Sequence, residues 1–170
     1  MKNIAKIKRE IFLHPTRKYH IRELARALQL NPNTVITLSE KLAKEGIIKR
    51  KKERHVVEIS ADSENKAFIR KKRLWNIGQL YDSGLVDFLV GYYDSPEAVM
   101  VIGSYSRGED IEKSDIDIVI INGKESIPET EGYERFLKRK IHLLPVRYEK
   151  VSKEFYANMI NGITLHGFIR

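Results

Sequence analysis

Apolar residues recur at helical spacing through the first third of the chain. This pattern predicts three helices, which cover residues 3–14, 21–28 and 32 to about 45. Pro15 disfavours helical backbone at the residue before it, and Asn31 followed by Pro32 is typical of a helix start. Gly46 supplies the left-handed residue that ends the third helix. We therefore expect a three-helix segment at the beginning of the chain.

Two extended segments follow the third helix directly. Ile47 to Lys52 and His55 to Ile59 have the pattern of strands, and they surround a tight turn at Glu53 and Arg54. Basic side chains gather toward the tip of this predicted hairpin: Lys49, Arg50, Lys51, Lys52 and Arg54. Such a hairpin is suited to lie along a phosphate backbone.

The charge of the chain is unevenly distributed along its length. Residues 1–73 contain 20 Lys and Arg against 8 Asp and Glu, a net charge of +12, whereas residues 74–170 contain 11 against 15, a net charge of −4. A basic segment attracts polyphosphates and releases counterions when it binds them, so nucleic acid is the expected partner of the first part. An ordinary solvated lysine surface is the alternative, and charge alone does not separate the two.

The stretch from about Ile7 to Ser60 resembles the winged helix-turn-helix domain of transcription factors, chiefly in the segment from Leu42 to Arg50. The resemblance implies binding of double-stranded DNA, with the third helix in the major groove and the hairpin as the wing. By position, Asn33, Thr34, Thr37 and Lys41 would contact base edges or phosphates, and Lys51, Lys52 and Arg54 would contact the backbone. Winged helices also serve as protein-interaction modules, but the basic charge favours DNA.

Residues 62–94 are predicted to form a helical linker. A helix capped by Asp62 or Ser63 is expected to run to about Tyr81, and a second short helix follows from Ser83. Ala67, Leu74 and Tyr81 are spaced by seven residues. This apolar stripe indicates either a seam between two copies of the chain or packing onto a flanking domain, and its short length favours packing.

Two acidic residues define the candidate chemistry of the second half. The pattern predicts a strand at residues 98–102, a loop with a short helix, and a second strand at residues 114–121. Side chains alternate along a strand, so Asp115 and Asp117 share one face. Two neighbouring carboxylates repel each other unless a cation neutralises them, and oxygen ligands favour Mg²⁺. Because Mg²⁺ completes its coordination with substrate phosphates, a nucleoside triphosphate is the expected ligand.

The end of the first of these strands has the features of a phosphate-binding turn. Gly103 and Ser104 stand where a helix begins, so their amides are available to an anion, and Arg107 offers a clamp one turn later. The string from Gly103 to Gly108, followed by Ser114 to Asp117, resembles the signature of the DNA polymerase beta-like nucleotidyltransferase superfamily, most closely its minimal nucleotidyltransferase branch.

This second resemblance covers about Ala98 to Gly167. It implies a small mixed sheet with flanking helices, a requirement for Mg²⁺, and transfer of a nucleotidyl group from a triphosphate to a hydroxyl. With the first resemblance it gives an α+β chain in three parts: a winged helix-turn-helix domain at 1–61, the linker at 62–94 and a nucleotidyltransferase-like domain at 95–170.

One position departs from the second family's pattern. Active members commonly carry a third acid on the next strand, and the matching strand, Lys140 to Val146, has His142 nearest that position. A histidine there would act as a general base or simply face solvent or the core, and the latter is favoured. The missing acid leaves open whether the chain is an active enzyme.

The rest of the composition narrows the function classes. The chain has no cysteine, which excludes a disulfide framework and thiolate chemistry, and no apolar run approaches the length of a membrane span, so we expect a cytoplasmic protein that does not bind membranes. The favoured function is a DNA-binding transcriptional regulator whose Mg²⁺-dependent domain binds or transfers a nucleotide. The alternatives are an antitoxin-like nucleotidyltransferase that modifies a partner protein and a catalytically inactive fold used as a scaffold.

Overall fold

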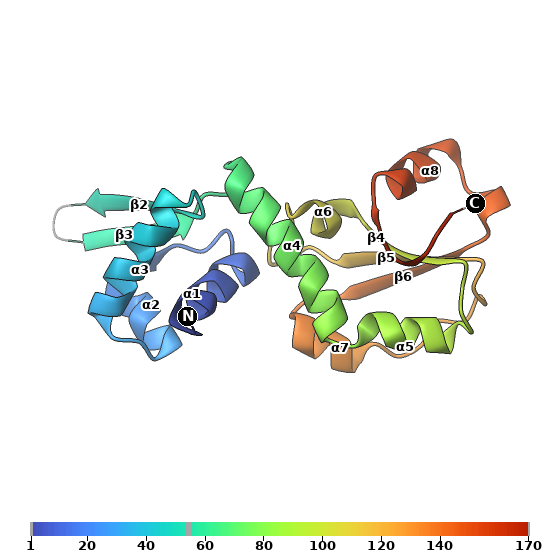
Figure 1. The fold of residues 1–170 in the computed structure, drawn as a ribbon, viewed down its shortest axis with the longest axis horizontal. Helices are drawn as coiled ribbons and strands as arrows, with labels where there is room; N and C mark the ends of the chain where they lie inside the picture. The colour runs from blue at the N-terminus through green and yellow to red at the C-terminus, as the bar shows by residue number, and fades with distance from the viewer. Residues whose placement is uncertain (1, 54–55, 170) are drawn as a thin grey trace. The chain divides into compact units, whose positions relative to one another are not determined.

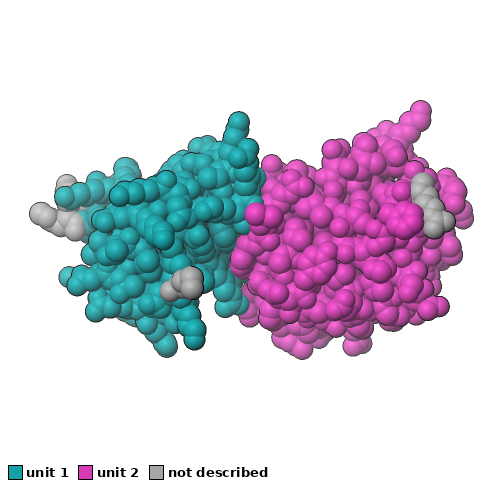
Figure 2. Space-filling view, viewed as in Figure 1, with its two compact units in different colours: residues 1–72 teal, residues 73–170 magenta. Residues whose placement is uncertain are grey.

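The computed structural model describes residues 2–53 and 56–169. The chain divides into two compact units, residues 1–72 and residues 73–170, which Figure 2 colours separately. The boundary between them falls inside one long helix, α4 (Lys66–Asp82). The predicted linker at residues 62–94 is therefore divided between the two units.

The first unit contains three helices and a small antiparallel sheet (Figure 1). Its elements are α1 (Lys2–Leu13), β1 (Tyr19–His20), α2 (Ile21–Leu28), α3 (Pro32–Lys44), β2 (Ile48–Glu53) and β3 (Val56–Ala61). The strands lie in the order β1-β3-β2, and both pairs are antiparallel. The core of this unit includes Ile7, Ile11, Leu24, Val35, Leu42 and Ile59. The three predicted helices and the hairpin strands are confirmed, with ends that differ by one or two residues.

One strand of this unit was not predicted, and one residue of the predicted turn lies outside the described residues. The sequence does not predict β1, because two residues are too few to show strand periodicity; the buried Tyr19 donates its hydroxyl to Glu10 at 2.8 Å. Of the predicted turn at Glu53 and Arg54, Arg54 lies outside the described residues.

The start of α4 corrects a predicted cap. The Asn65 side chain accepts a hydrogen bond from the Ala67 amide at 2.9 Å and donates one to Asp62 at 3.0 Å. Asn65 therefore satisfies a free amide at the beginning of the helix, and α4 starts at Lys66 rather than at the predicted Asp62 or Ser63.

The apolar stripe of α4 also differs from the favoured prediction. Leu74 is 74% exposed and Tyr81 is 48% exposed, whereas Phe68 and Leu80 are buried. The helix thus packs through a face that the seven-residue spacing of Ala67, Leu74 and Tyr81 does not identify. The buried face also contains polar residues, Asn76 among them, so a pattern of apolar residues does not reveal this face.

The second unit is built on a four-stranded mixed sheet in the order β6-β5-β4-β7. Its strands are β4 (Ala98–Ile102), β5 (Ile116–Ile121), β6 (Ile141–Val146) and β7 (Ile163–Gly167). β5 and β6 are parallel, and β4 is antiparallel to both β5 and β7. The remaining elements are α5 (Leu85–Tyr92), α6 (Gly103–Arg107), α7 (Glu131–Leu137), the 3-10 turn η1 (Tyr148–Lys150) and α8 (Lys153–Ile160). The predicted α+β class and small mixed sheet are confirmed.

Alternating side chains of the two central strands fill two apolar layers. Val99 and Ile118 pack with Leu89 of α5 on one face of the sheet, whereas Met100 and Val119 pack with Met159 of α8 on the other. Figure 1 shows α5 and α8 on opposite sides of the sheet. Because both faces are covered, β4 and β5 are almost entirely apolar and only their ends are free to carry polar groups.

Two further observations concern the helices. α7 begins at Glu131 and ends at Leu137. Among residues 2–53 and 56–169, no helix is both long enough and apolar enough to cross a membrane.

Candidate active site and nucleic-acid interface

The predicted phosphate-binding turn lies at the end of β4. Gly103 has a φ of +72°, a conformation that side chains disfavour, and it is the first residue of α6. Ser106 donates its hydroxyl to the Gly103 carbonyl at 2.8 Å, and Gly108, with a φ of +76°, ends the helix. The sequence therefore folds here into a sharp strand-to-helix turn whose amides at Gly103 and Ser104 precede the first helical hydrogen bonds.

Pairing of β4 with β5 places Asp117 against this turn. Ile102 is opposite Asp117 in the antiparallel register. A Cβ atom added to Gly103 would lie 3.0 Å from the Asp117 Oδ2 atom, which is tighter than about nine in ten such contacts. Glycine at position 103 thus suits the backbone conformation and also leaves room for the Asp117 carboxylate, which a Cβ atom would crowd.

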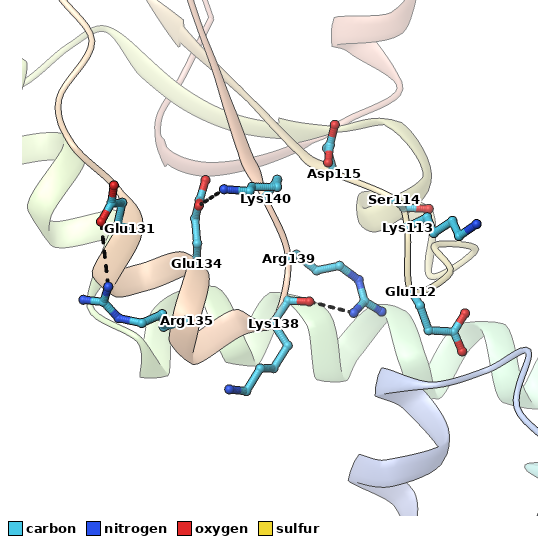
Figure 3. A pocket seen from close by; sticks show the side chains of 10 residues that line it. All are labelled: Glu112, Lys113, Ser114, Asp115, Glu131, Glu134, Arg135, Lys138, Arg139 and Lys140. Atoms are coloured by element: carbon cyan, nitrogen blue, oxygen red, sulfur yellow. Dashed lines mark hydrogen bonds and ion pairs between the residues drawn. The ribbon is translucent and has the colours of Figure 1, made fainter.

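Asp115 stands just outside the strand in which it was predicted. β5 begins at Ile116, so Asp115 is the residue immediately before the strand, and its side chain is exposed. Its side chain lines a pocket of about 500 Å³, which Figure 3 shows from close by. The two predicted acids therefore flank the first residue of β5, Asp117 beside the turn and Asp115 at the pocket.

His142 occupies the neighbouring position on the next strand, as predicted. The parallel register pairs it with Asp117, and its Nδ1 atom lies 3.2 Å from the Asp117 Oδ1 atom. The His142 side chain is 61% exposed and that of Asp117 is 36% exposed, so solvent reaches both. The imidazole of His142 thus occupies the position expected for a third acid, and it contacts Asp117.

Arg107, the predicted phosphate clamp, pairs with a nearby carboxylate in this structure. Its Nε atom donates to Glu109 Oε2 at 2.7 Å, and both side chains are about half exposed. An exposed ion pair of this kind contributes little free energy, so exchange of Glu109 for a phosphate as the partner costs little.

The pocket beside Asp115 is a feature that the sequence does not predict. Its lining comes from the loop before β5, from α7 and from the residues before β6: Glu112, Lys113, Ser114, Asp115, Glu131, Glu134, Arg135, Lys138, Arg139 and Lys140. Nine of these ten are charged, so the pocket suits a polar ligand rather than an apolar one. A run of charges at residues 138–140 is the one sequence signal, and by itself it indicates only a solvated surface.

Glu134 fixes one wall of this pocket. It accepts a hydrogen bond from the Ile141 amide at 3.0 Å and another from the Lys140 ammonium group at 3.0 Å. The amide and the ammonium group lower the pKa of Glu134, and Glu134 in turn raises the pKa of Lys140. The ionised carboxylate of Glu134 thereby connects α7 to the first residue of β6.

The donor set at this site fits a hard cation. No cluster of three or more His, Cys, Asp or Glu residues suited to a metal occurs in the described part of the chain. Mg²⁺, however, is usually held by one or two carboxylates and by substrate phosphates. Asp117, beside the turn with free amides, and Asp115, two residues before it at the pocket, are carboxylates of the kind that such a set requires.

Comparison with known families agrees with this geometry. Residues 84–162 match the model of the family described as "Nucleotidyltransferase domain". The second unit is therefore similar, over most of its length, to a nucleotidyltransferase domain. No curated protein sequence matches the chain.

The predicted DNA-contacting residues of α3 lie on its outward side. Asn33, Thr37 and Lys41 are exposed and Thr34 is half-buried. The Thr37 hydroxyl donates to the Asn33 carbonyl at 3.2 Å, within its own helix. On β2, Lys51 and Lys52 are exposed, and Arg54 lies outside the described residues.

Two basic residues of the hairpin serve within the first unit. Lys49 pairs with Asp62 and with Glu64, each at 3.2 Å, and these pairs raise the pKa of Lys49. Arg50 pairs with Glu40 of α3 at 3.0 Å. The positive charge at the start of the hairpin is therefore partly used to fix β2 to its surroundings.

The close approach of Asp117 to Gly103 predicts a difference between two glycine substitutions. Gly84 has a φ of +76° and open space around its α-carbon, so Gly84→Ala should cost only the conformational penalty, about 1–2 kcal/mol. Gly103→Ala should lower the free energy of unfolding by more than that, because its Cβ also displaces Asp117. Denaturant unfolding measures both, and Asp117→Ala in the Gly103→Ala background should remove the excess. Equal losses in the two single variants would contradict the close approach.

Proposed function

We propose that the second unit binds a nucleoside triphosphate with Mg²⁺ and transfers its nucleotidyl group to a hydroxyl-bearing acceptor. The observation that carries this proposal is the Asp117 carboxylate against Gly103 in the strand-to-helix turn. The family match at residues 84–162 supports nucleotide transfer in general.

In this proposal the turn binds the phosphates and the acids hold the cation. The amides of Gly103 and Ser104 and the Ser104 hydroxyl donate to phosphate oxygens, and Arg107 leaves Glu109 to join them. Asp115 and Asp117 hold Mg²⁺, which when bound neutralises phosphate charge and favours ionisation of the acceptor hydroxyl. The hydroxyl oxygen forms a bond to the α-phosphorus, and pyrophosphate leaves with the electrons of the broken bond.

His142 receives the proton of the acceptor hydroxyl in the same proposal. When its Nδ1 atom carries hydrogen and donates to Asp117, the Nε2 atom is left as an acceptor. The pocket beside Asp115 is the room for the acceptor. An antitoxin-like enzyme that modifies a partner protein would use the same residues and differ only in that acceptor.

A second candidate for this unit is a nucleotide-binding fold without turnover, used as a scaffold. It is favoured by one observation, the imidazole of His142 beside Asp117 where active relatives commonly carry a carboxylate. One ligand fewer weakens the hold on the cation that activates the acceptor.

For the first unit we propose sequence-specific binding of double-stranded DNA through a winged helix, which would make the protein a transcriptional regulator. The order of three helices and a hairpin, the outward side chains of α3 and the net charge of +12 in residues 1–73 support it. Asn33, Thr34, Thr37 and Lys41 are assigned to the major groove, and Lys51, Lys52 and Arg54 to the phosphate backbone.

Triphosphate and Mg²⁺ together should stabilise the second unit more than either does alone. At a ligand concentration of 100 times the dissociation constant the gain is about 2.7 kcal/mol. Asp117→Asn should abolish the dependence on Mg²⁺, whereas Asp87→Asn, an exposed change on α5, should leave it intact. Thermal unfolding with each combination of ligands measures this. Equal stabilisation by triphosphate with and without Mg²⁺ would refute the assigned role of the acids.

Replacement of His142 separates the two candidates for the second unit. If that position lacks a needed ligand, His142→Asp should raise Mg²⁺-dependent transfer about tenfold or more, as measured by pyrophosphate release. If His142 is the general base, His142→Ala should lower transfer about 10²-fold or more instead. A protein that transfers nucleotides equally well in all three forms would exclude both roles.

The DNA proposal predicts which lysines matter. Duplex binding by the full chain should weaken steeply with salt, and Lys51→Ala with Lys52→Ala should lower the steepness of log K against log salt by about 2. Lys2→Ala with Lys6→Ala, exposed residues of α1, removes the same charge and should change it less. Thr37→Ala or Asn33→Ala should relax sequence preference instead. Equal effects of the two lysine pairs would indicate that charge, not the wing, carries the binding.

A further inference from the structure

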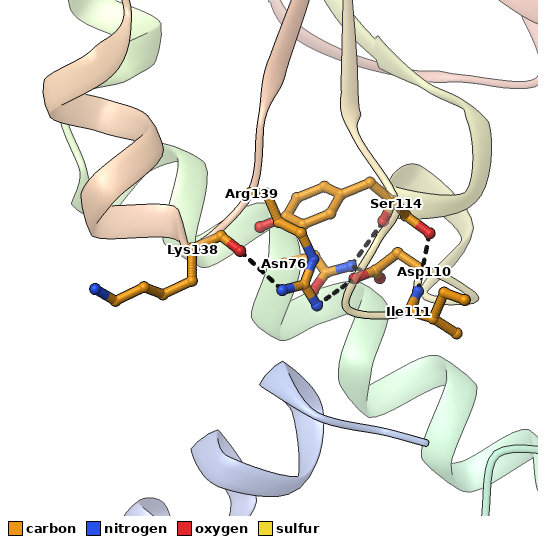
Figure 4. A network of polar contacts seen from close by, with 7 residues as sticks. Asn76, Asp110, Ile111, Ser114, Lys138 and Arg139 are labelled. Atoms are coloured by element: carbon orange, nitrogen blue, oxygen red, sulfur yellow. Dashed lines mark hydrogen bonds and ion pairs between the residues drawn. The ribbon is translucent and has the colours of Figure 1, made fainter. Parts of the chain in front are cut away.

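Figure 4 shows a buried network of polar contacts that includes Asn76, Asp110 and Arg139. Asn76 of α4 is 0% exposed, Asp110 is 2% exposed and Arg139 is 6% exposed. Asp110 lies in the loop between α6 and β5, and Arg139 lies two residues before β6. Charged residues are rarely buried to this extent without a specific arrangement around them.

The contacts of these side chains join separate segments of the unit. Asn76 donates from its Nδ2 atom to the Tyr105 carbonyl at 2.8 Å and to Asp110 Oδ1 at 2.7 Å. Arg139 donates from one NH2 group to Asp110 Oδ2 at 3.3 Å and from the other to the Lys138 carbonyl at 2.9 Å. One amide therefore ties α6 to the following loop, and one guanidinium ties that loop to the segment before β6.

The segments that are joined are those that hold the proposed site. Tyr105 follows Gly103 and Ser104 in α6, and Asp110 begins the loop that ends at Asp115. Within that loop the Ile111 amide donates to the Ser114 hydroxyl at 3.0 Å. The Ile116 amide donates to the Lys140 carbonyl at 2.8 Å, directly beside Arg139. The turn, the two acids and the strand of His142 thus share one buried anchor.

A buried ion pair is a poor device for stability alone. The cost of removing two charges from water commonly equals or exceeds their attraction, and well-packed neutral side chains often stabilise a fold as well or better. A catalytic arrangement, in contrast, depends on fixed relative positions of groups on different segments.

We propose that Asp110, Arg139 and Asn76 are positioning residues that hold the loop between α6 and β5, residues 108–115, and with it Asp115 and Asp117, in register with the Gly103 turn. This inference rests on the proposed nucleotide site and adds the residues that align it. None of the three belongs to the set that contacts the nucleotide in that proposal.

The test removes the charges while it keeps the shape. The double variant Asp110→Asn with Arg139→Met retains an acceptor for Asn76 and a side chain of similar length at position 139. Its thermal midpoint should stay within a few degrees of that of the unaltered protein, whereas Arg139→Met alone should be much less stable because it leaves a buried charge unpaired. Amide hydrogen exchange at Ile111, Ser114 and Ile116 should become at least tenfold faster in the double variant, without any ligand.

The matched control lies at the ends of β4 and β5 that are far from the Gly103 turn. There, Glu97 accepts a hydrogen bond from Asn122 at 2.7 Å, and Glu97→Ala should leave hydrogen exchange at Ile111, Ser114 and Ile116 unchanged. The dissociation constant for a triphosphate with Mg²⁺ should rise at least fivefold in the double variant and not in the control.

Unchanged exchange and unchanged nucleotide binding in a stable double variant would overturn the positioning role. If the unaltered protein binds no triphosphate, the proposed function fails. The exchange result then still decides whether these residues hold the loop.

Discussion

The antiparallel pairing of β4 with β5 is the contact on which the candidate site depends. It sets Ile102 opposite Asp117, and the chain turns at Gly103, where an added Cβ atom would lie 3.0 Å from the Asp117 carboxylate. A shift of the register by one residue would carry Asp117 to the other face of the sheet and Ile116 or Ile118 into its place. The apolar layers on both faces prevent that shift, because they require Ile118 on the side of α5 and Val119 on the side of α8.

The parts of the fold that follow from local patterns were predictable. The alternation from Ile116 to Ile121 indicated a strand with Asp117 near its start, and the glycine and serine after an apolar strand indicated the turn. The expected shared face of Asp115 and Asp117 is not established, because Asp115 precedes the strand. The resemblance to the nucleotidyltransferase superfamily assigned His142 to the strand next to the acids, and the parallel register of β5 and β6 pairs it with Asp117. The helices of the first unit followed from their spacing and from the cap at Asn31, whose side chain accepts from the Asn33 amide at 2.8 Å.

The parts that depend on distant contacts were not predictable. Asp110 and Arg139 are 29 residues apart, and nothing in either sequence neighbourhood marks them as a buried pair. The pocket beside Asp115 is assembled from three separate segments. A hydrophobic pattern also misjudges α4, where polar Asn76 is buried and Leu74 is exposed.

The central claim is that Asp115, Asp117 and the Gly103 turn form one nucleotide site. The most direct measurement is a crystal structure with Mn²⁺ and a non-hydrolysable triphosphate, because the anomalous signal of manganese locates the cation without reference to any activity. The account predicts an anomalous peak within bonding distance of both carboxylates and phosphate oxygens on the amides of Gly103 and Ser104. A nucleotide bound elsewhere on the chain, with no peak at Asp115 and Asp117, would contradict it.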